Sequence, residues 1–311
     1  MAETLPDKSK PATPQPAVPQ LLMQPGPERR HPDFATLSGI AVALAGIIGG
    51  LLMEKGSIQD VAQGTAAMIV FGGTLGAVLV TNPLPIVMRA FRGLGDVFFE
   101  RVISAQGTID LVINFATKAR KNGIVSLETD AAAIPDPFLR KALNLAVDGT
   151  DLQELRRMMD TDIGLAEQAA EAEARVWESA GGYAPTIGII GVVMGLIQVM
   201  KHLEDIKEVG HGIAVAFVAT VYGVGSANIF FLPAASKLRA RMRHATLLKE
   251  MMLDGIIGIV EGLNPTLIRM KMDAFNPRQP QPGKKAAASP NAAKGTPSKA
   301  AATPEPASAR T

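Results

Sequence analysis

The stretch that decides the fold is Phe34–Met53, which reads FATLSGIAVALAGIIGGLLM and holds no charged side chain. A helix of about twenty residues crosses a hydrocarbon core of roughly 30 Å. Three more charge-free stretches follow, at Val61–Asn82, Tyr183–Met200 and Gly212–Leu232. Buried core helices of a large soluble protein are the alternative, but four such stretches rarely occur in soluble folds. The sequence therefore predicts an all-α, polytopic membrane protein with four transmembrane helices.

The composition indicates a membrane chain without metal or cofactor chemistry. Hydrophobic residues make up 47% of the 311 residues and charged residues 19%, below the ~25% usual for soluble domains. The chain has 31 basic and 29 acidic residues, so its charge gives no reason to expect a nucleic-acid partner. It has no cysteine, and its four histidines lack the spacing of metal ligands. We therefore expect no metal and no cofactor, and the apolar composition argues against an ordinary soluble enzyme.

Proline-rich composition marks both ends of the chain, where we expect disordered tails without a packed core. The segment between the second and third apolar stretches is too long for a simple connection, and we expect a helical cytoplasmic domain there. The sequence thus divides into an N-terminal tail (1–33), spans one and two (34–82), the helical domain (83–182), spans three and four (183–232), C-terminal cytoplasmic helices (233–275) and a C-terminal tail (276–311).

Basic residues flank the spans on one side. Arg89 and Arg92 follow the second span, and a basic run from Lys237 to Arg243 follows the fourth. The short connections between paired spans carry no comparable basic excess. By the positive-inside rule, we expect both termini and the helical domain to lie in the cytoplasm.

Local patterns place helices on both sides of spans three and four. We expect a helix over Asp96–Asn122 that ends at Gly123, and a short helix over Phe138–Val147. Thr150–Gln153 has the form of a capping box, so a long helix should start there and continue into the third span. After the fourth span, Ser236–Glu261 again has a helical pattern.

Small residues recur four positions apart within the spans, as at Gly46 and Gly50, Gly72 and Gly76, and Gly191 and Gly195. Residues four apart share one helix face. In lipid, helices associate through close backbone packing at such faces. The pattern favours a tightly packed bundle or oligomer over isolated anchors.

The four spans contain no Asp, Glu, Lys or Arg. Proteins that move ions normally keep an ionisable group inside the membrane, so any titrating group would have to come from another chain. The polar groups within the spans are hydroxyls, Thr186, Thr220 and Tyr222 among them. A threonine hydroxyl can simply bond a carbonyl of its own helix, and that alternative stays open for each threonine.

Four motifs, in order along the chain, resemble those of a known family. They are IVFGGTLGA (Ile69–Ala77), RKNGIVSLE (Arg120–Glu128), GYAPTIGIIG (Gly182–Gly191) and EGLNP (Glu261–Pro265). Over about Phe34–Phe275 the chain resembles the family of the flagellar stator protein MotA and, within it, the branch that includes PomA. The more distant relatives TolQ and ExbB have fewer spans.

The resemblance implies a stator subunit of the bacterial flagellar motor, located in the inner (cytoplasmic) membrane. Subunits of this family form a homo-oligomeric ring, a pentamer, around the single-span helices of a MotB-like partner. The partner supplies the membrane aspartate that binds the ion. Ring and partner together form an ion channel that converts ion flow into torque on the rotor protein FliG.

The resemblance also assigns channel residues. Pro185 and Pro233 match prolines at the cytoplasmic ends of spans three and four, where Pro185 either starts a helix or marks a kink. Thr220 matches a channel-facing threonine. Sodium-driven members carry a threonine where this chain has Val192, and valine offers no oxygen ligand for a desolvated sodium ion. We therefore expect H⁺ as the driving ion, with Na⁺ left open because Thr186 and Thr220 remain as hydroxyls.

Arg120 and Glu128 match the charged loop residues that engage FliG in the family. For isolated charges, a solvated loop face is the alternative.

Two other functions stay open at this point. One is a TolQ/ExbB-like energy-transducing membrane subunit coupled to an envelope protein. The other is a small-molecule carrier, although no inverted repeat or polar broken helix supports it.

Overall fold

The computed structural model describes residues 30–101 and 104–275. The predicted tails (1–33 and 276–311) lie outside the described residues, except for residues 30–33. Four described helices are long and apolar enough to cross a membrane, namely Phe34–Met53, Gly64–Thr81, Leu152–Lys201 and Ile206–Val260. The prediction of a helical membrane protein with four spans is confirmed.

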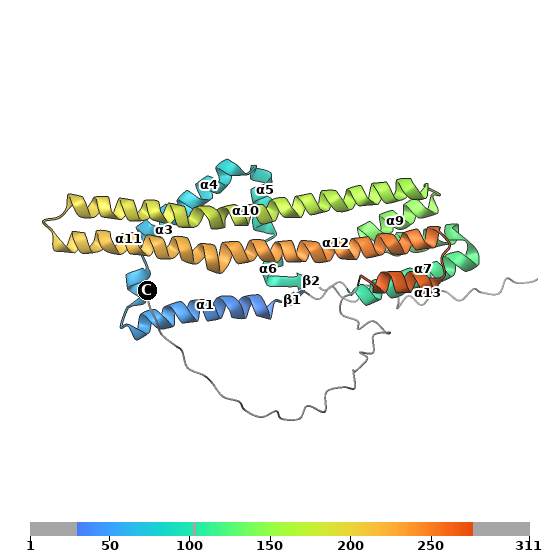
Figure 1. Cartoon of the computed structure of the whole chain (residues 1–311), viewed down its shortest axis with the longest axis horizontal. Helices are drawn as coiled ribbons and strands as arrows, with labels where there is room; N and C mark the ends of the chain where they lie inside the picture. Colours follow the sequence, from blue (N-terminus) through green and yellow to red (C-terminus); the bar gives the residue numbers. More distant parts are fainter. Residues whose placement is uncertain (1–29, 102–103, 276–311) are drawn as a thin grey trace, which may run out of the picture. The chain divides into compact units, whose positions relative to one another are not determined.

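Figure 1 shows the order of the elements along the chain. The first part contains β1 (Arg30–Pro32), α1 (Phe34–Met53), α2 (Ile58–Val61), α3 (Gly64–Ala67), η2 (Met68–Gly72), α4 (Gly73–Thr81), α5 (Leu84–Arg92), α6 (Gly95–Phe98) and β2 (Phe99–Arg101). The rest contains α7 (Ala105–Asn122), η3 (Ile124–Leu127), α8 (Glu128–Ala133), α9 (Pro137–Val147), α10 (Leu152–Lys201), α11 (Ile206–Ser226), η4 (Ala227–Phe231), α12 (Leu232–Val260) and α13 (Pro265–Asp273).

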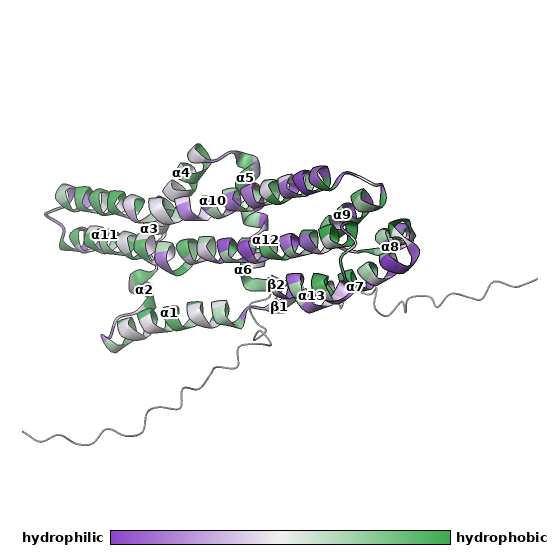
Figure 2. Ribbon diagram, turned by 45° about the vertical axis from the view of Figure 1, so that its right-hand side comes forward, coloured by the Kyte–Doolittle hydropathy of each residue, from purple (hydrophilic) through white to green (hydrophobic). Residues whose placement is uncertain are grey.

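Two long helical stretches extend spans three and four beyond their apolar segments. α10 is one helix of 50 residues, as predicted for a helix that runs into the third span. α11, the π-helical turn η4 and α12 follow one another directly, so the fourth span also continues, to Val260. Figure 2 shows hydrophobic residues gathered in α11 and in the part of α10 beside it, and hydrophilic residues at the other end of α10.

The start of α10 differs from the predicted capping box. The N-cap is Asp151 rather than Thr150, and its carboxylate accepts hydrogen bonds from the backbone N–H groups of Gln153 (3.0 Å) and Glu154 (3.4 Å). A carboxylate at this position also interacts favourably with the positive end of the helix dipole. The aspartate therefore caps the helix, which begins at Leu152.

Close backbone contact joins α10 and α11. On each helix the contact uses small residues spaced four, three and four positions apart: Ala184, Gly188, Gly191 and Gly195 on α10, and Gly212, Ala216, Ala219 and Gly223 on α11. A Cβ atom added to Gly195 would lie 2.7 Å from the carbonyl oxygen of Gly212. The predicted pair Gly191 and Gly195 thus lies in a helix contact, whereas the glycine pairs of spans one and two meet no described neighbour within 4 Å.

The second span packs on α11. Ala66 and Val70 are fully buried and lie against Val215, Val218 and Ala219. The span contains a π-helical turn, η2, between α3 and α4. The second span also contacts α10 directly, since a Cβ added to Gly73 would lie 2.8 Å from the Ile187 side chain.

Tyr222 of α11 holds the start of the second span. Its hydroxyl donates to the carbonyl oxygen of Val61 at 2.6 Å and accepts from the backbone N–H of Gln63 at 3.3 Å. The tyrosine hydroxyl predicted inside the fourth span is therefore engaged by the loop between α2 and α3.

The first span, α1, is the least packed part of the described chain. None of its residues is buried. It contacts α6 and η4 near its N-terminal end. Most of its apolar surface is thus left for lipid or for another chain.

The membrane-distal helices have their own hydrophobic core. α7, η3, α8, α9 and α13 pack around the first part of α10 and the last part of α12. Fully buried side chains in this core include Ile109, Leu139, Leu155, Ile256 and Met272. The two long helical stretches therefore join this helical domain to spans three and four.

The prediction of one helix over Asp96–Asn122 is wrong at its start. The structure has α6, then β2, and then α7. β2 pairs antiparallel with β1, so the described part of this mainly helical chain contains one small two-stranded ladder. α7 begins after Ser104, whose hydroxyl oxygen accepts from the backbone N–H of Gly107 at 3.1 Å. A serine N-cap favours a new helix start at this point.

We expect Gly195→Ala to destabilise the folded chain by about 1–3 kcal/mol, because the new Cβ would overlap the backbone of α11. Gly164→Ala, in the same helix with open space around it, should be neutral or stabilise by about 0.5–1 kcal/mol, because alanine is the better helix former. Thermal unfolding of the detergent-solubilised protein measures both. Equal unfolding temperatures for the two variants would contradict a tight contact between α10 and α11.

Candidate functional site

Pro185 lies well inside α10, so the interpretation as a helix-start proline is wrong. Its ring has no N–H for the carbonyl of Gly181, one turn earlier. The next residue, Thr186, donates its hydroxyl to the carbonyl oxygen of Tyr183 at 2.8 Å. In the single chain Pro185 is half-buried and Thr186 is exposed.

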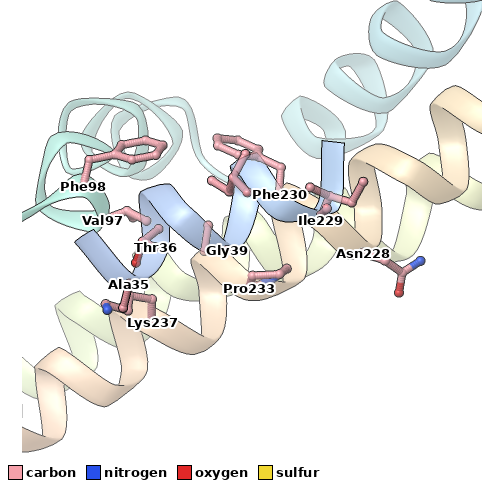
Figure 3. Close-up of a pocket in the computed structure, with 13 residues that line it drawn as sticks. Ala35, Thr36, Gly39, Val97, Phe98, Asn228, Ile229, Phe230, Pro233 and Lys237 are labelled. Carbon is pink, nitrogen blue, oxygen red and sulfur yellow. The ribbon is translucent and has the colours of Figure 1, made fainter. Parts of the chain in front are cut away.

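Pro233 stands in the first turn of α12, directly after the π-helical turn η4. It has no N–H to offer the carbonyl of Ile229, and its ring would crowd that group in a regular α-helix. A π-helical turn is one adjustment by which a membrane helix accommodates a proline. Pro233 is exposed. It lines a cavity of about 350 Å³ formed by α1, α6, η4 and α12, to which Lys237 also contributes (Figure 3).

The structure brings the two prolines to similar levels of the helix pair. Gly181 of α10 meets Leu232 of α12, because a Cβ added to the glycine would lie 2.6 Å from the leucine side chain. Pro185 follows Gly181 by one turn, and Pro233 adjoins Leu232. The prolines therefore lie within about two turns of each other along the helix axes.

Val192 and Thr220 lie at a second level, further into the spans. They adjoin Gly191 and Ala219, which face each other so closely that a Cβ on the glycine would lie 2.6 Å from the alanine Cβ. Val192 is half-buried and Thr220 is exposed, with its hydroxyl 3.4 Å from the carbonyl oxygen of Ala216. Bonds to carbonyls of the same helix are ordinary for threonine. A hydroxyl that donates in this way keeps lone pairs that can accept a bond.

Arg120 and Glu128 lie away from the four spans, on the membrane-distal helical domain. Arg120 is in the last turn of α7 and Glu128 in the first turn of α8, with η3 between them. Both are exposed. Neither forms an ion pair or a side-chain hydrogen bond with another described residue, whereas nearby Lys118 and Asp130 pair at 2.6 Å. The structure therefore leaves both predicted rotor residues open to another protein.

A charged cluster at the start of α1 was not predicted from the sequence. The buried carboxylate of Asp33 caps α1 by accepting from the backbone N–H of Thr36 at 3.2 Å, and it pairs with Lys237 and Arg241 of α12. Arg241 also donates to the carbonyl oxygen of Phe99 at 2.7 Å. The hydrogen bond from Lys237 is the main cause that holds the pKa of Asp33 at about 2.

The signal for this cluster was only partly visible in the sequence. An aspartate just before an apolar run is a helix-start signal, and the basic run after the fourth span was visible as an orientation signal. Their pairing joins residues 204 positions or more apart, since Asp33 meets Lys237. No local pattern indicates such a contact.

A second cluster fixes α12 to α10. Arg239 donates to both carboxylate oxygens of Glu171, at 2.9 and 3.1 Å, and also pairs with Glu178. Such two-pronged pairs are among the stronger ion pairs. The bonds from Arg239 lower the pKa of both glutamates, and the two carboxylates raise the pKa of Arg239. The basic run thus anchors helices to each other besides flanking the fourth span.

Comparison with known proteins gives matches along most of the chain. A family model described as the MotA/TolQ/ExbB proton channel family matches residues 130–251, and one described as Motility protein A N-terminal matches residues 37–123. The motility protein A of Bacillus subtilis (strain 168) is 30% identical over 246 residues, which are 79% of this chain and 91% of that protein. The chemotaxis protein PomA of Vibrio alginolyticus is 31% identical over 236 residues, 76% of this chain and 92% of that protein. The solved structure of C. jejuni MotAB matches with a TM-score of 0.75 at 30% identity, over 80% of this chain and 99% of that chain.

Four apolar helices and these matches define the class: the chain is a multi-pass membrane protein of the MotA/TolQ/ExbB proton channel family. Within this family it belongs to the motility protein A group that comprises MotA and PomA, and it is a flagellar stator subunit. At 30% and 31% identity, the MotA and PomA relatives do not separate the two branches.

We expect Asp33→Asn to weaken the attachment of α1 by at most about 2 kcal/mol at pH 7. The amide can still cap the helix, but it cannot pair with Lys237 and Arg241. Because the folded-state pKa of Asp33, about 2, lies below its ordinary value of 3.8, the stabilisation is fully present above about pH 4 and is lost as the pH falls through about 2.

The measurement is the thermal unfolding of wild type and variant in detergent over this pH range. Ser38→Ala, near the N-terminal end of α1, is the control. The gap between wild type and Asp33→Asn should close as the medium is acidified. A gap that does not change with pH would show that the ion pairs contribute nothing.

Proposed function

We propose that copies of this chain form a pentameric ring around the single-span helices of a MotB-like partner, and that ring and partner conduct ions across the bacterial inner membrane to drive the flagellar rotor. The solved structures that resemble the chain are a C. jejuni MotAB and a flagellar MotAB stator complex from Bacillus subtilis, which supports this choice of partner. One observation carries the proposal. Four spans lack any Asp, Glu, Lys or Arg, so the ion-binding carboxylate has to come from the partner.

The channel face that we assign lies on spans three and four. Thr186, Thr220 and Pro233 are exposed in the single chain, and Pro185 and Val192 are half-buried. A partner aspartate beside this face would change between charged and neutral forms as the ion binds and leaves. In a medium of low dielectric, each change alters its interaction with hydroxyls and backbone dipoles. The membrane potential contributes about 2.3 kcal/mol per charge per 100 mV.

Mechanical coupling to the rotor is assigned to the membrane-distal domain. α10 and the stretch α11–η4–α12 run without a break from the channel face into that domain. Ring movements at the channel face are therefore carried by helices rather than by loops. Arg120 and Glu128, exposed and without a partner among the described residues, are the residues we assign to the contact with FliG.

The orientation follows from the charge distribution. The basic run after the fourth span lies in α12, on the side of the helical domain. We assign this side to the cytoplasm by the positive-inside rule, and with it both ends of the chain.

The function that we propose is mechanical rather than enzymatic.

The envelope-coupled alternative of the TolQ and ExbB kind is not favoured. The relatives described above are motility or chemotaxis proteins, and each matches more than three quarters of this chain.

Reversing either rotor charge tests the coupling. We expect Arg120→Glu or Glu128→Lys to reduce swimming speed by more than half, because each side chain is exposed and its sign must match the rotor surface. Membrane levels and co-purification of the partner should stay unchanged. Arg157→Glu, an exposed reversal elsewhere on the same domain, serves as the control. Normal swimming of the double variant Arg120→Glu, Glu128→Lys would remove both residues from the rotor contact.

A second test concerns the ion. We expect swimming speed to be independent of sodium concentration at fixed pH and to collapse with a protonophore, because Val192 offers no oxygen ligand to a sodium ion. Val192→Thr keeps nearly the same side-chain shape and replaces one methyl group with a hydroxyl, so it is the matched variant. Speed that follows sodium and survives the protonophore in the wild type would instead establish sodium drive.

A further inference from the structure

A cavity of about 350 Å³ opens beside Arg120 in the helical domain. Apart from Arg120 and Thr150, its lining side chains are apolar. They come from several elements and include Ala119 of α7, Ile124 of η3, Ala146 of α9, Val260 of α12 and Leu263 after it. This volume is at the lower end of the range of ligand pockets in proteins, about 300–1,000 Å³.

The cavity forms where three helices end. Gly123 follows α7 with φ +82°, Gly149 lies just after α9 with φ +74°, and Gly262 lies just after α12 with φ +69°. Glycine in this left-handed conformation commonly ends helices. A Cβ added to any of the three would meet no described atom within 4 Å. Gly149 and Gly262 line the cavity, and so does Ile124, which follows Gly123. The cavity therefore lies where these three helices end.

Arg120 places a positive charge at the rim of the cavity. Arg120 and Lys121 are in the last turn of α7, and Arg120 lines the cavity. Among the described residues no acidic side chain lines it, since Asp148 and Glu261 adjoin lining residues but are not among them. Val125, within the motif that ends at Glu128, exposes 66% of its surface. The surface beside Arg120 therefore combines apolar side chains, an open cavity and an unpaired positive charge.

We propose that this cavity is an apolar anchor point for the rotor: one bulky aliphatic or aromatic side chain of a rotor helix enters it, while a carboxylate about one turn away on that helix pairs with Arg120. The proposal rests on the proposed function and adds a packing component to a contact so far described by charge alone. Interfaces concentrate their binding on a few side chains buried in pockets, with charged groups around them that mainly set orientation and encounter rate.

Filling the cavity tests the proposal. Ala119 is half-buried at the cavity, so Ala119→Phe should occupy it from the chain's own side. Asn114→Phe adds the same ring at an exposed position of α7 and is the matched control. Both are made in the full chain, purified with its single-span partner in nanodiscs, and titrated with purified FliG. We expect Ala119→Phe to weaken rotor binding at least tenfold and Asn114→Phe to change it less than twofold, with equal thermal unfolding for the two.

The outcomes separate this proposal from the proposed function. If Arg120→Glu abolishes FliG binding while Ala119→Phe binds like wild type, the rotor contact holds and the anchor proposal fails. If neither variant affects FliG binding, the assignment of this surface to the rotor fails, and the anchor with it. If Ala119→Phe breaks up the ring, a second copy of the chain covers the cavity, which also overturns the anchor.

A labelling experiment gives an independent readout. The chain has no cysteine, so Ala119→Cys provides a unique thiol at the cavity. We expect FliG to slow maleimide labelling of this thiol at least tenfold, and to leave labelling of Asn114→Cys nearly unchanged. Labelling of the cavity thiol that FliG does not slow would overturn the proposal even if filling the cavity impairs binding.

Discussion

Backbone contact between α10 and α11 sets the spacing on which the other elements depend. Gly188 and Gly195 of α10, and Gly212 and Gly223 of α11, lie so close to main-chain atoms of the other helix that no side chain could stand between them. In lipid, where apolar burial gives little drive, such close contact gains dispersion energy. The second span then packs on α11 through Val70. Val192 and Thr220, which we propose as channel residues, adjoin the contact at Gly191 and Ala219, so their positions follow from it.

Where the spans leave the apolar region on the side of the helical domain, ion pairs rather than close backbone packing hold the helices together. Arg239 fixes α12 to α10, and Asp33 fixes the start of α1 to α12. Small residues hold the helices together within the apolar spans. Ion pairs hold them together where the chain leaves the apolar region. The basic run therefore contributes to orientation and to packing with the same side chains.

The sequence was sufficient for the four spans, for the long helix that feeds the third, and for the family. These features depend on runs of apolar residues and on motifs in order, which are local properties. It was insufficient where a single polar side chain determines the residue at which a helix begins. Ser104 caps α7, although the 96–122 pattern predicts an earlier start, and Asp151 caps α10 in place of Thr150. It was also insufficient for long-range pairs such as Asp33 with Lys237.

For the candidate site, the family motifs named the residues, but only the structure shows how they lie. Pro185 and Thr186 share one helix with Val192, while Thr220 and Pro233 lie on the stretch packed against it. The π-helical turn before Pro233 is not visible in the pattern, because hydropathy does not distinguish a π-turn from a regular one. Which of these side chains face a partner is decided by the assembly, and a single sequence carries no local signal for that.

The unbroken length of α10 makes the helix a lever. At 1.5 Å per residue its 50 residues extend about 75 Å. A tilt of about 3° at one end would displace the other by about 4 Å, close to the width of a side chain. A small movement at one end of α10 is therefore magnified by the length of the helix. Because α10 stays one helix through Pro185, the size of that displacement depends on the length of the helix.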